Sequence, residues 1–254
     1  MLVGVQTYTL RNYMKTEREI TRSLEKVAQM GYTCVQISGL GPIEPKKLKN
    51  ICDSFGLKIA LTHISEDRLM NETDAVIEEH NILDCKYIGL GAMSDCYRGE
   101  VPEWLDYFIE DFKVPAQKIA AAGKRFMYHN HNFEFQKING VRIFDRLIEG
   151  FAAEEMGFTL DTYWIQAGGA DICDWIEKLR GRIPCVHLKD MDVRGMTSVM
   201  APIGEGNIPF EKILKQLEGY GDVEYLLVEQ DVCAESPFIC LKKSYEYLSS
   251  LGYK

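Results

Sequence analysis

Eight short apolar segments recur along the chain, and this repetition restricts the possible fold more than any other feature. They predict strands over 2–9, 32–38, 58–64, 86–92, 125–131, 157–163, 183–189 and 224–230. Most are continuous apolar runs rather than alternating patterns, as is typical of parallel strands that are buried on both faces. Their starts are 26 to 41 residues apart, which leaves room for one helix and two loops in each interval.

The segments between the predicted strands carry helical periodicity. In 16–30, Ile20 and Leu24 lie on one face with charged residues opposite, and Gly31 ends the pattern. Similar patterns predict helices over 70–83, 103–122, 171–180, 209–218 and 237–250. Pro115 predicts a kink or a break in the second of these.

Strands that alternate with helices in this way predict an α/β fold, a (β/α)₈ barrel that forms one domain over residues 1–254. A doubly wound open sheet is the alternative, but no glycine-rich phosphate loop follows the first strand. The length of 254 residues allows a substantial core, and barrels of this size are routinely single domains.

Charge and composition disfavour several kinds of partner. The net charge of −9 argues against a nucleic-acid partner, because phosphate binding needs a basic face. No apolar run approaches 18 residues, so we expect no membrane span, and the first residues lack the layout of a signal peptide. The eight cysteines form no CxxC pair, which favours reduced thiols in a cytoplasmic protein.

Acidic and imidazole side chains stand at the ends of the later apolar segments. A parallel barrel gathers the C-terminal strand ends on one face, so these side chains would converge there. Asp161, His187 and Glu229 would supply two carboxylates and one imidazole, which suits Mn²⁺, Mg²⁺, Co²⁺ or Zn²⁺. The segment YHNHNFEF adds His129 and Glu134, either of which could join this set.

Several other residues near the strand ends are candidates for contact with a substrate. They are Gln6, Gln36, His63, His131, Trp164 and Lys189. Each has a structural alternative: His63 could be hydrogen-bonded at the rim, Trp164 could pack in the core, and Lys189 could pair with Asp190. Lys189 could also stabilise a developing oxyanion.

Segment 190–207 carries no helical pattern and predicts a long loop, of the kind that often forms a lid over an active site. Arg194 and Glu205 lie in this segment and are its candidates for contact with a ligand. For Arg194, a solvated position on the rim is the favoured alternative.

The combination of YHNHNFEF, LDTYW, HLKD, GEG and VEQD resembles the xylose-isomerase-like TIM-barrel superfamily, specifically its sugar phosphate isomerase/epimerase group. The resemblance extends over essentially the whole chain. It implies one divalent metal ion, often Mn²⁺, held by Glu, Asp, His and Glu from four strand ends. Asp161, His187 and Glu229 match the second, third and fourth ligands. Relatives commonly have Glu where this chain has His129, so either His129 or Glu134 is the first ligand; Glu134 is preferred because it restores the charge.

The group includes keto-sugar epimerases, inosose dehydratases, 3-dehydroshikimate dehydratases and lyases acting on 3-keto-glycosides. The resemblance therefore predicts a metal-dependent sugar isomerase or epimerase that removes a proton next to the carbonyl of a keto-sugar or keto-cyclitol, through an enediolate. Glu229, Glu134 and His129 are the candidate catalytic bases. A dehydratase or lyase is the first alternative, and a non-catalytic sugar-binding barrel is an alternative of another class.

Many relatives have His where this chain has Trp164, which argues against the trinuclear zinc endonucleases of the superfamily. The sequence leaves open whether the chain forms a homo-oligomer.

Overall fold

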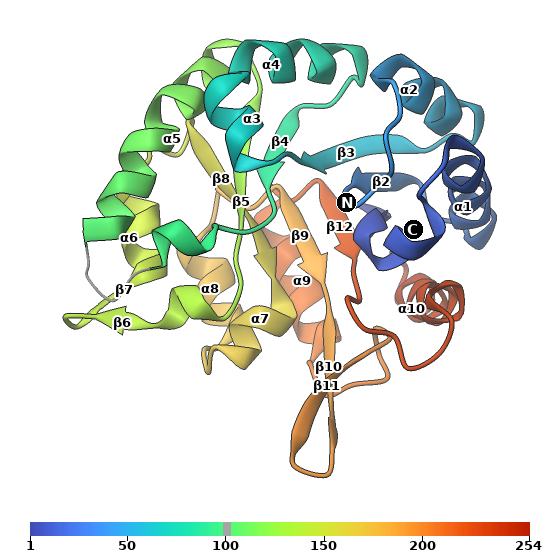
Figure 1. The fold of residues 1–254 in the computed structure, drawn as a ribbon. Coiled ribbons are helices and arrows are strands. Elements are labelled where there is room, and N and C mark those ends of the chain that lie inside the picture. The colour runs from blue at the N-terminus through green and yellow to red at the C-terminus, as the bar shows by residue number, and fades with distance from the viewer. Residues whose placement is uncertain (99–102) are drawn as a thin grey trace.

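The computed structural model describes residues 1–98 and 103–254. Eight parallel strands close into a barrel in the order β1-β12-β9-β8-β5-β4-β3-β2, which confirms the predicted (β/α)₈ fold. The barrel strands are β1 (Leu2–Gln6), β2 (Cys34–Ile37), β3 (Lys58–His63), β4 (Tyr87–Leu90), β5 (Arg125–His129), β8 (Met156–Asp161), β9 (Cys185–Leu188) and β12 (Tyr225–Val228). Figure 1 shows the helices arranged around the outside of this barrel.

Ten α-helices and three short 3-10 helices lie among the described residues. The α-helices are α1 (Glu17–Met30), α2 (Pro45–Ser54), α3 (Glu66–Asn71), α4 (Thr73–Ile82), α5 (Glu103–Ala121), α6 (Ile143–Gly150), α7 (Thr162–Ala167), α8 (Ile172–Lys178), α9 (Phe210–Tyr220) and α10 (Pro237–Ser250). The 3-10 helices are η1 (Thr7–Tyr13), η2 (Asp95–Tyr97) and η3 (Phe133–Phe135). Within the described ranges, no helix combines the length and the apolar character that crossing a membrane requires.

The strands end earlier than the apolar runs predicted. β1 ends at Gln6, whose side-chain oxygen accepts the N–H of Tyr8 at 2.8 Å and starts η1. β8 ends at Asp161, whose Oδ1 accepts the N–H of Trp164 at 2.9 Å and starts α7. Side-chain caps thus remove the last predicted strand residues from the ladder and turn them into the first turn of a helix.

Two helical segments differ from their predictions. The helix predicted over 70–83 is two helices, α3 and α4, because Glu72 between them leaves the helical conformation. Pro115 does not break α5, which is one helix. The core-facing side of α5 is buried along its length, at Phe108, Phe112, Ala116 and Ile119. We infer that this packing offsets the hydrogen bond that the proline cannot donate.

The segment predicted as a long loop over 190–207 contains an antiparallel hairpin, β10 (Asp190–Arg194) and β11 (Thr197–Ala201). The buried carboxylate of Asp190 fixes its base by accepting the backbone N–H groups of Gly204, Gly206 and Ile208, as well as that of Met191. Figure 1 shows the hairpin projecting away from the barrel. A second, two-residue hairpin pairs β6 (Lys137–Ile138) with β7 (Val141–Arg142).

A small apolar cluster, separate from the main core, fills the barrel lumen. Its members are Cys34, Ala60, Leu61, Tyr87, Met127, Cys185, Tyr225 and Leu227. Side chains alternate between the two faces of a strand, so residues two positions further on point into the lumen as well. The residues two positions after Cys34, Met127, Cys185 and Leu227 are Gln36, His129, His187 and Glu229. The alternation therefore places a polar layer directly above the apolar one.

All eight cysteines are free thiols.

Candidate metal centre and substrate cavity

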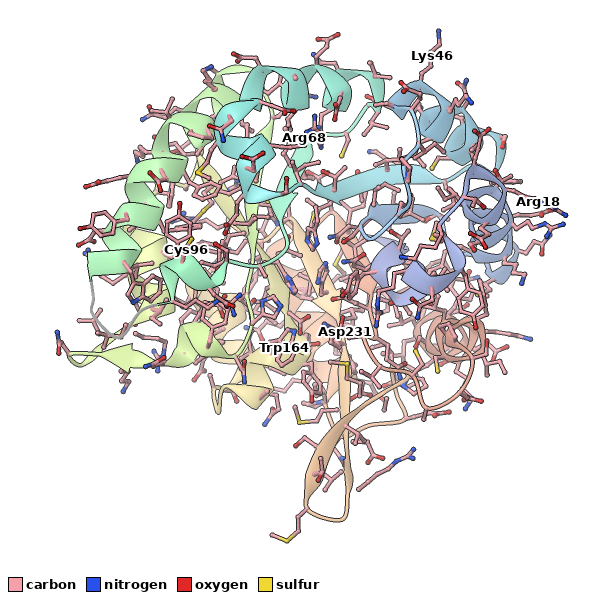
Figure 2. All side chains as sticks on the ribbon, in the orientation of Figure 1. Arg18, Lys46, Arg68, Cys96, Trp164 and Asp231 are labelled. Carbon is pink, nitrogen blue, oxygen red and sulfur yellow. The ribbon has the colours of Figure 1, made fainter. Side chains whose placement is uncertain are left out.

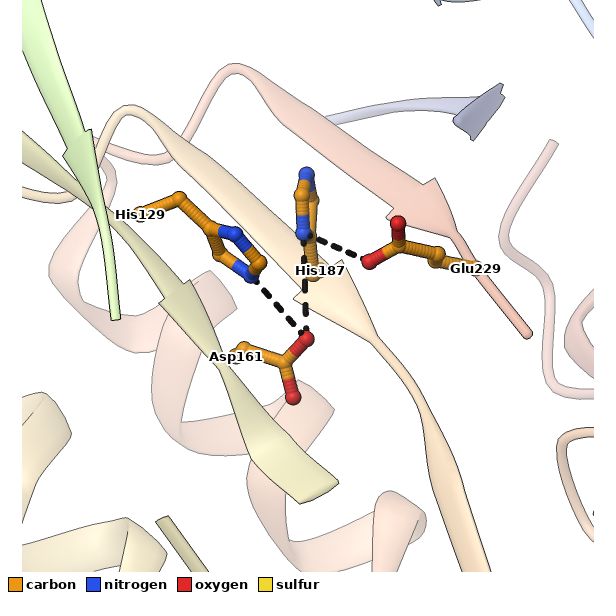
Figure 3. A group of neighbouring side chains, drawn as sticks. All are labelled: His129, Asp161, His187 and Glu229. Carbon is orange, nitrogen blue, oxygen red and sulfur yellow. Dashed lines mark hydrogen bonds and ion pairs between the residues drawn. The ribbon is translucent and has the colours of Figure 1, made fainter. Parts of the chain in front are cut away.

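Four buried side chains from four strand ends meet at the mouth of the barrel (Figure 3). His129 ends β5, Asp161 ends β8, His187 lies in β9, and Glu229 directly follows β12. One ligand atom from each residue lies within 4.8 Å of those of the other three. The strand register produces this convergence, because Asp161 lies opposite His187 and the N–H of Glu229 donates to the carbonyl of Leu188.

The imidazoles of His129 and His187 both turn a lone pair towards this cluster. Nδ1 of His129 lies 2.8 Å from the carbonyl oxygen of Gly91, which only accepts, so Nδ1 carries the proton and Nε2 faces Oδ2 of Asp161 at 3.3 Å. Nε2 of His187 donates to Oε1 of Gln36 at 2.6 Å, which leaves Nδ1 facing Oε2 of Glu229 at 3.0 Å. Acceptors of this kind orient histidine ligands in metal centres.

The surroundings of two atoms in the cluster show whether the four residues fit a metal ion. Nδ1 of His187 and Oε2 of Glu229 are buried and have no hydrogen-bond partner, although the ammonium of Lys189 lies 2.9 Å from the oxygen as an ion pair. A lone pair and a carboxylate oxygen that face each other attract only through a proton or a cation between them. Two carboxylates with two imidazoles therefore fit a divalent metal ion.

The buried ammonium of Lys189 lies among three carboxylates. Its Nζ is 3.1 Å from Oδ2 of Asp161, 2.9 Å from Oε2 of Glu229 and 2.8 Å from Oδ2 of Asp231. Burial favours the neutral amine, but the three carboxylates outweigh it and raise the pKa of Lys189. Burial likewise opposes ionisation of Asp161 and Glu229, but the Lys189 ammonium and the neighbouring imidazoles together outweigh burial and lower the pKa of both carboxyl groups. Both carboxyl groups are therefore anions at neutral pH.

Glu134 does not join this cluster, contrary to the preferred expectation for the first ligand. Its Oε1 accepts the hydroxyl of Tyr128 at 2.8 Å, and its Oε2 accepts the N–H of His131 at 2.8 Å. Burial raises the pKa of Glu134 to about 7. Because η3 turns both oxygens towards these donors, the carboxylate is directed away from the strand ends, and His129 completes the group of four. The same geometry directs Nε2 of His129 towards Asp161, so His129 takes the place among the four clustered residues that was expected of Glu134.

A cavity of about 800 Å³ opens beside the cluster. Four of the predicted substrate contacts line it: Gln6, His63, His131 and Lys189. His129 and Glu229 line it as well, so the candidate metal centre faces the space in which a ligand would lie. Burial, and next to it the neighbouring His129 imidazole, lower the pKa of His131 to about 3, so the His131 imidazole is neutral at physiological pH.

The other four predicted contacts, Gln36, Trp164, Arg194 and Glu205, are not part of the cavity lining. The ring of Trp164 lies 5.3 Å from that of His131 and 5.4 Å from Nζ of Lys189, so it packs behind two lining residues. Figure 2 shows Trp164 near the centre of the molecule. Arg194 and Glu205 are exposed, and Glu205 pairs with Lys243 at 3.2 Å. Both were expected at the site because 190–207 was predicted to form a lid, whereas the hairpin carries this segment outwards.

Sequence reasoning missed two residues of the site and the role of a third. The carboxylate of Asp231 pairs with Lys189, which also pairs with the cluster, and Asp231 lines the cavity. Arg11 lines the cavity as well, and its guanidinium donates to the backbone carbonyl of Asp231 at 2.9 Å. Asp231 lies in an irregular segment and Arg11 in the short 3-10 helix η1, both beyond strand ends, where no periodicity indicates direction. Gln36 joins His187 to His63. Alternation from the buried Cys34 was a signal that could have indicated its direction.

Comparisons with known proteins agree with the barrel fold. Inosose dehydratase from Lacticaseibacillus casei is 21% identical over 271 residues, which cover 92% of this chain and 90% of that protein. A sugar phosphate isomerase/epimerase from Parabacteroides distasonis superposes with a TM-score of 0.83 at 21% identity, covering 98% of this chain and 96% of its own. L-ribulose 3-epimerase superposes with a TM-score of 0.78 at 16% identity, covering 98% and 93%. At these identities the superpositions show the fold alone.

The motifs in the sequence resemble one superfamily, and a family profile provides an independent comparison. The profile described as "Xylose isomerase-like TIM barrel" matches residues 24–232, which is well over half of the chain. The similar proteins named above are enzymes. The chain belongs to the xylose isomerase-like TIM barrel family.

Proposed function

We propose that the protein is a divalent-metal-dependent sugar isomerase or epimerase, which removes the proton next to the carbonyl group of a keto-sugar or keto-cyclitol. One observation carries this proposal: two buried carboxylates and two imidazole lone pairs face one another beside an open cavity. The volume of about 800 Å³ lies within the range of small-molecule sites and accommodates a single sugar ring. The names of the similar enzymes support a carbohydrate or cyclitol substrate.

We propose Nε2 of His129, Oδ2 of Asp161, Nδ1 of His187 and the carboxylate of Glu229 as the metal ligands. Their mixed oxygen and nitrogen atoms suit Mn²⁺, Co²⁺ or Zn²⁺ better than Mg²⁺, which favours oxygen. We propose Mn²⁺ first, because the family resemblance implies it. A divalent ion bound there would act as a Lewis acid that polarises a carbonyl and stabilises the negative charge formed when the neighbouring proton leaves.

The protein's own residues would then bind the substrate and move the proton. Glu229 is the proposed base, since it lines the cavity and is ionised: burial opposes its charge, but the Lys189 ammonium and the neighbouring imidazoles together lower its pKa. His63 and His131 line the same cavity and would hydrogen-bond the hydroxyl groups of the substrate. Return of the proton to the opposite face of the same carbon gives an epimer, and its transfer to the neighbouring carbon gives an isomer.

A dehydratase is the second candidate, and His131 is the observation that favours it. Its Nδ1 is buried without a hydrogen-bond partner, and the residue lines the cavity next to His129. The N–H of this neutral imidazole could hydrogen-bond a hydroxyl that leaves from the carbon beyond the abstracted proton, and the proton taken up by Glu229 would leave with that hydroxyl as water. The similar inosose dehydratase aligns over 90% of its own length, which agrees with this alternative.

Solvent-deuterium exchange tests the shared first step of both reactions. The protein, loaded with Mn²⁺ or stripped with EDTA, is incubated in D₂O with keto-pentoses, keto-hexoses and an inosose, and the sugars are examined by mass spectrometry. We expect deuterium next to the carbonyl only with the metal, and its loss in a folded Glu229→Gln variant. Lys243→Met is the matched surface control. Binding of a sugar without exchange would instead identify a non-catalytic barrel, and undiminished exchange after stripping would contradict the role of the metal.

A further inference from the structure

Gln36 joins two imidazoles of the site through a single amide group. Its Oε1 lies 2.6 Å from Nε2 of His187, and its Nε2 lies 2.7 Å from Nε2 of His63. Gln36 is fully buried in β2, His63 ends β3, and His187 lies in β9. An amide oxygen only accepts and an amide nitrogen only donates, so the two imidazoles present opposite partners to it. His187 presents an N–H, whereas His63 presents a lone pair.

We propose that Gln36 is a positioning residue that holds His63 in the tautomer with its proton on Nδ1, and that His63 thereby donates a hydrogen bond to an oxygen atom of the substrate. This inference rests on the proposed function in one respect, because a metal ion on Nδ1 of His187 requires the proton on its Nε2. Gln36 must then turn Oε1 to His187 and its amino group to His63. The imidazole of His63 accepts that N–H and keeps its own proton on Nδ1.

The surroundings of His63 leave this proton available to a ligand. Nδ1 lies 3.4 Å from Oγ of Ser38, which is long for a hydrogen bond, and both residues line the cavity. A Cβ at Gly91 would lie 2.8 Å from this nitrogen, so the absence of a side chain there keeps Nδ1 uncovered. A neutral N–H donor suits the hydroxyl or carbonyl oxygen of an uncharged sugar.

Nuclear magnetic resonance reads the proposed tautomer directly. Two-bond proton–nitrogen correlation spectra of the protein with ¹⁵N-labelled histidine are recorded at pH 8, without metal and with Zn²⁺. The chain has five histidines, and His63→Gln and His187→Gln assign the two signals. We expect the proton of His63 on Nδ1 in both spectra and that of His187 on Nε2 with Zn²⁺. A wild-type His63 with its proton on Nε2 would overturn the proposal, whatever the variants do.

The variant Gln36→Glu keeps the contact of residue 36 with His187 but changes its contact with His63. A carboxylate accepts from both imidazoles, so His187 keeps its proton on Nε2 while His63 moves its own from Nδ1 to Nε2. We expect Zn²⁺ affinity within about tenfold of wild type and α-proton exchange lowered by about 100-fold, as for a lost oxyanion donor. Gln166→Glu, at an exposed position of α7, is the matched control and leaves the spectra unchanged.

The two proposals fail in distinguishable ways. An unshifted His63 tautomer in Gln36→Glu contradicts the positioning role, even if exchange is lost. Absence of exchange in the wild type, with tautomers as expected, contradicts the proposed reaction while the role of Gln36 stands.

Discussion

Lys189 and a divalent metal ion would use the same oxygen atoms. The ammonium contacts Oδ2 of Asp161 and Oε2 of Glu229, which are the oxygens that face the two imidazole lone pairs. Asp231 offers the same ammonium a third oxygen outside the cluster. We infer that metal binding transfers Lys189 towards Asp231, so that the buried carboxylates are never left without a positive charge.

The variant Lys189→Met tests this shared use. Without metal, it leaves buried carboxylates unpaired, and we expect its unfolding free energy in urea to fall by roughly 3–5 kcal/mol. Mn²⁺ affinity, measured by competition with a chelator, should rise because the ion no longer displaces an ammonium. Lys243→Met is the control, since its pairs with Glu205 and Glu235 lie at the surface, where solvent screens them. Unchanged Mn²⁺ affinity in Lys189→Met would contradict the inference that Lys189 and the metal ion use the same oxygen atoms.

The raised pKa of Glu134 should make the stability of the folded protein depend on pH. Burial raises its pKa in the folded protein from 4.5 to about 7, so the folded state binds this proton more tightly than the unfolded state does. Its contribution to stability is present below pH 4.5 and is lost as the pH rises to about 7. Relative to Glu134→Gln, the wild type should lose up to about 3 kcal/mol between pH 5 and pH 8 in urea unfolding. Parallel pH profiles would show that Glu134 is not protonated in the fold.

At the scale of elements, the ends of strands were harder to predict than their existence. All eight barrel strands arise from apolar runs, but Gln6 and Asp161 end their strands by capping the helices that follow. An apolar run does not reveal which of its last residues will accept a backbone N–H instead of continuing the ladder. The hairpin within 190–207 was missed for a related reason, because exposed strands such as β10 carry little apolar periodicity.

Asp161 therefore has two separable roles, as the cap of α7 and as a proposed ligand. In Asp161→Asn, the side-chain oxygen can still accept the N–H of Trp164, whereas Asp161→Ala loses both roles. We expect both variants to lose Mn²⁺ affinity by at least about 100-fold. In EDTA, the Asn variant should be more stable than the Ala variant by about 1 kcal/mol. Equal stability of the two variants would contradict the role of Asp161 as the cap of α7. Wild-type Mn²⁺ affinity of the Asn variant would contradict its role as a metal ligand.

At the scale of the whole molecule, the order of elements and three of the four clustered residues followed from the sequence. Asp161, His187 and Glu229 end or follow apolar strands, where the barrel fold dictates their direction. His129 and Glu134 could not be separated, because four residues, 130–133, lie between the end of β5 and Glu134, and the turn of η3 has no signal in the pattern. The excess of acidic residues fits a protein that binds a cation and an uncharged substrate.

Anomalous X-ray scattering from crystals grown with Mn²⁺ tests the proposed metal centre most directly. We predict one strong anomalous peak at the barrel mouth, about 2 Å from Nε2 of His129, Nδ1 of His187 and the carboxylate oxygens of Asp161 and Glu229, with Lys189 turned to Asp231. A map without a peak among these four residues, with Lys189 still bridging Asp161 and Glu229, would contradict the metal centre.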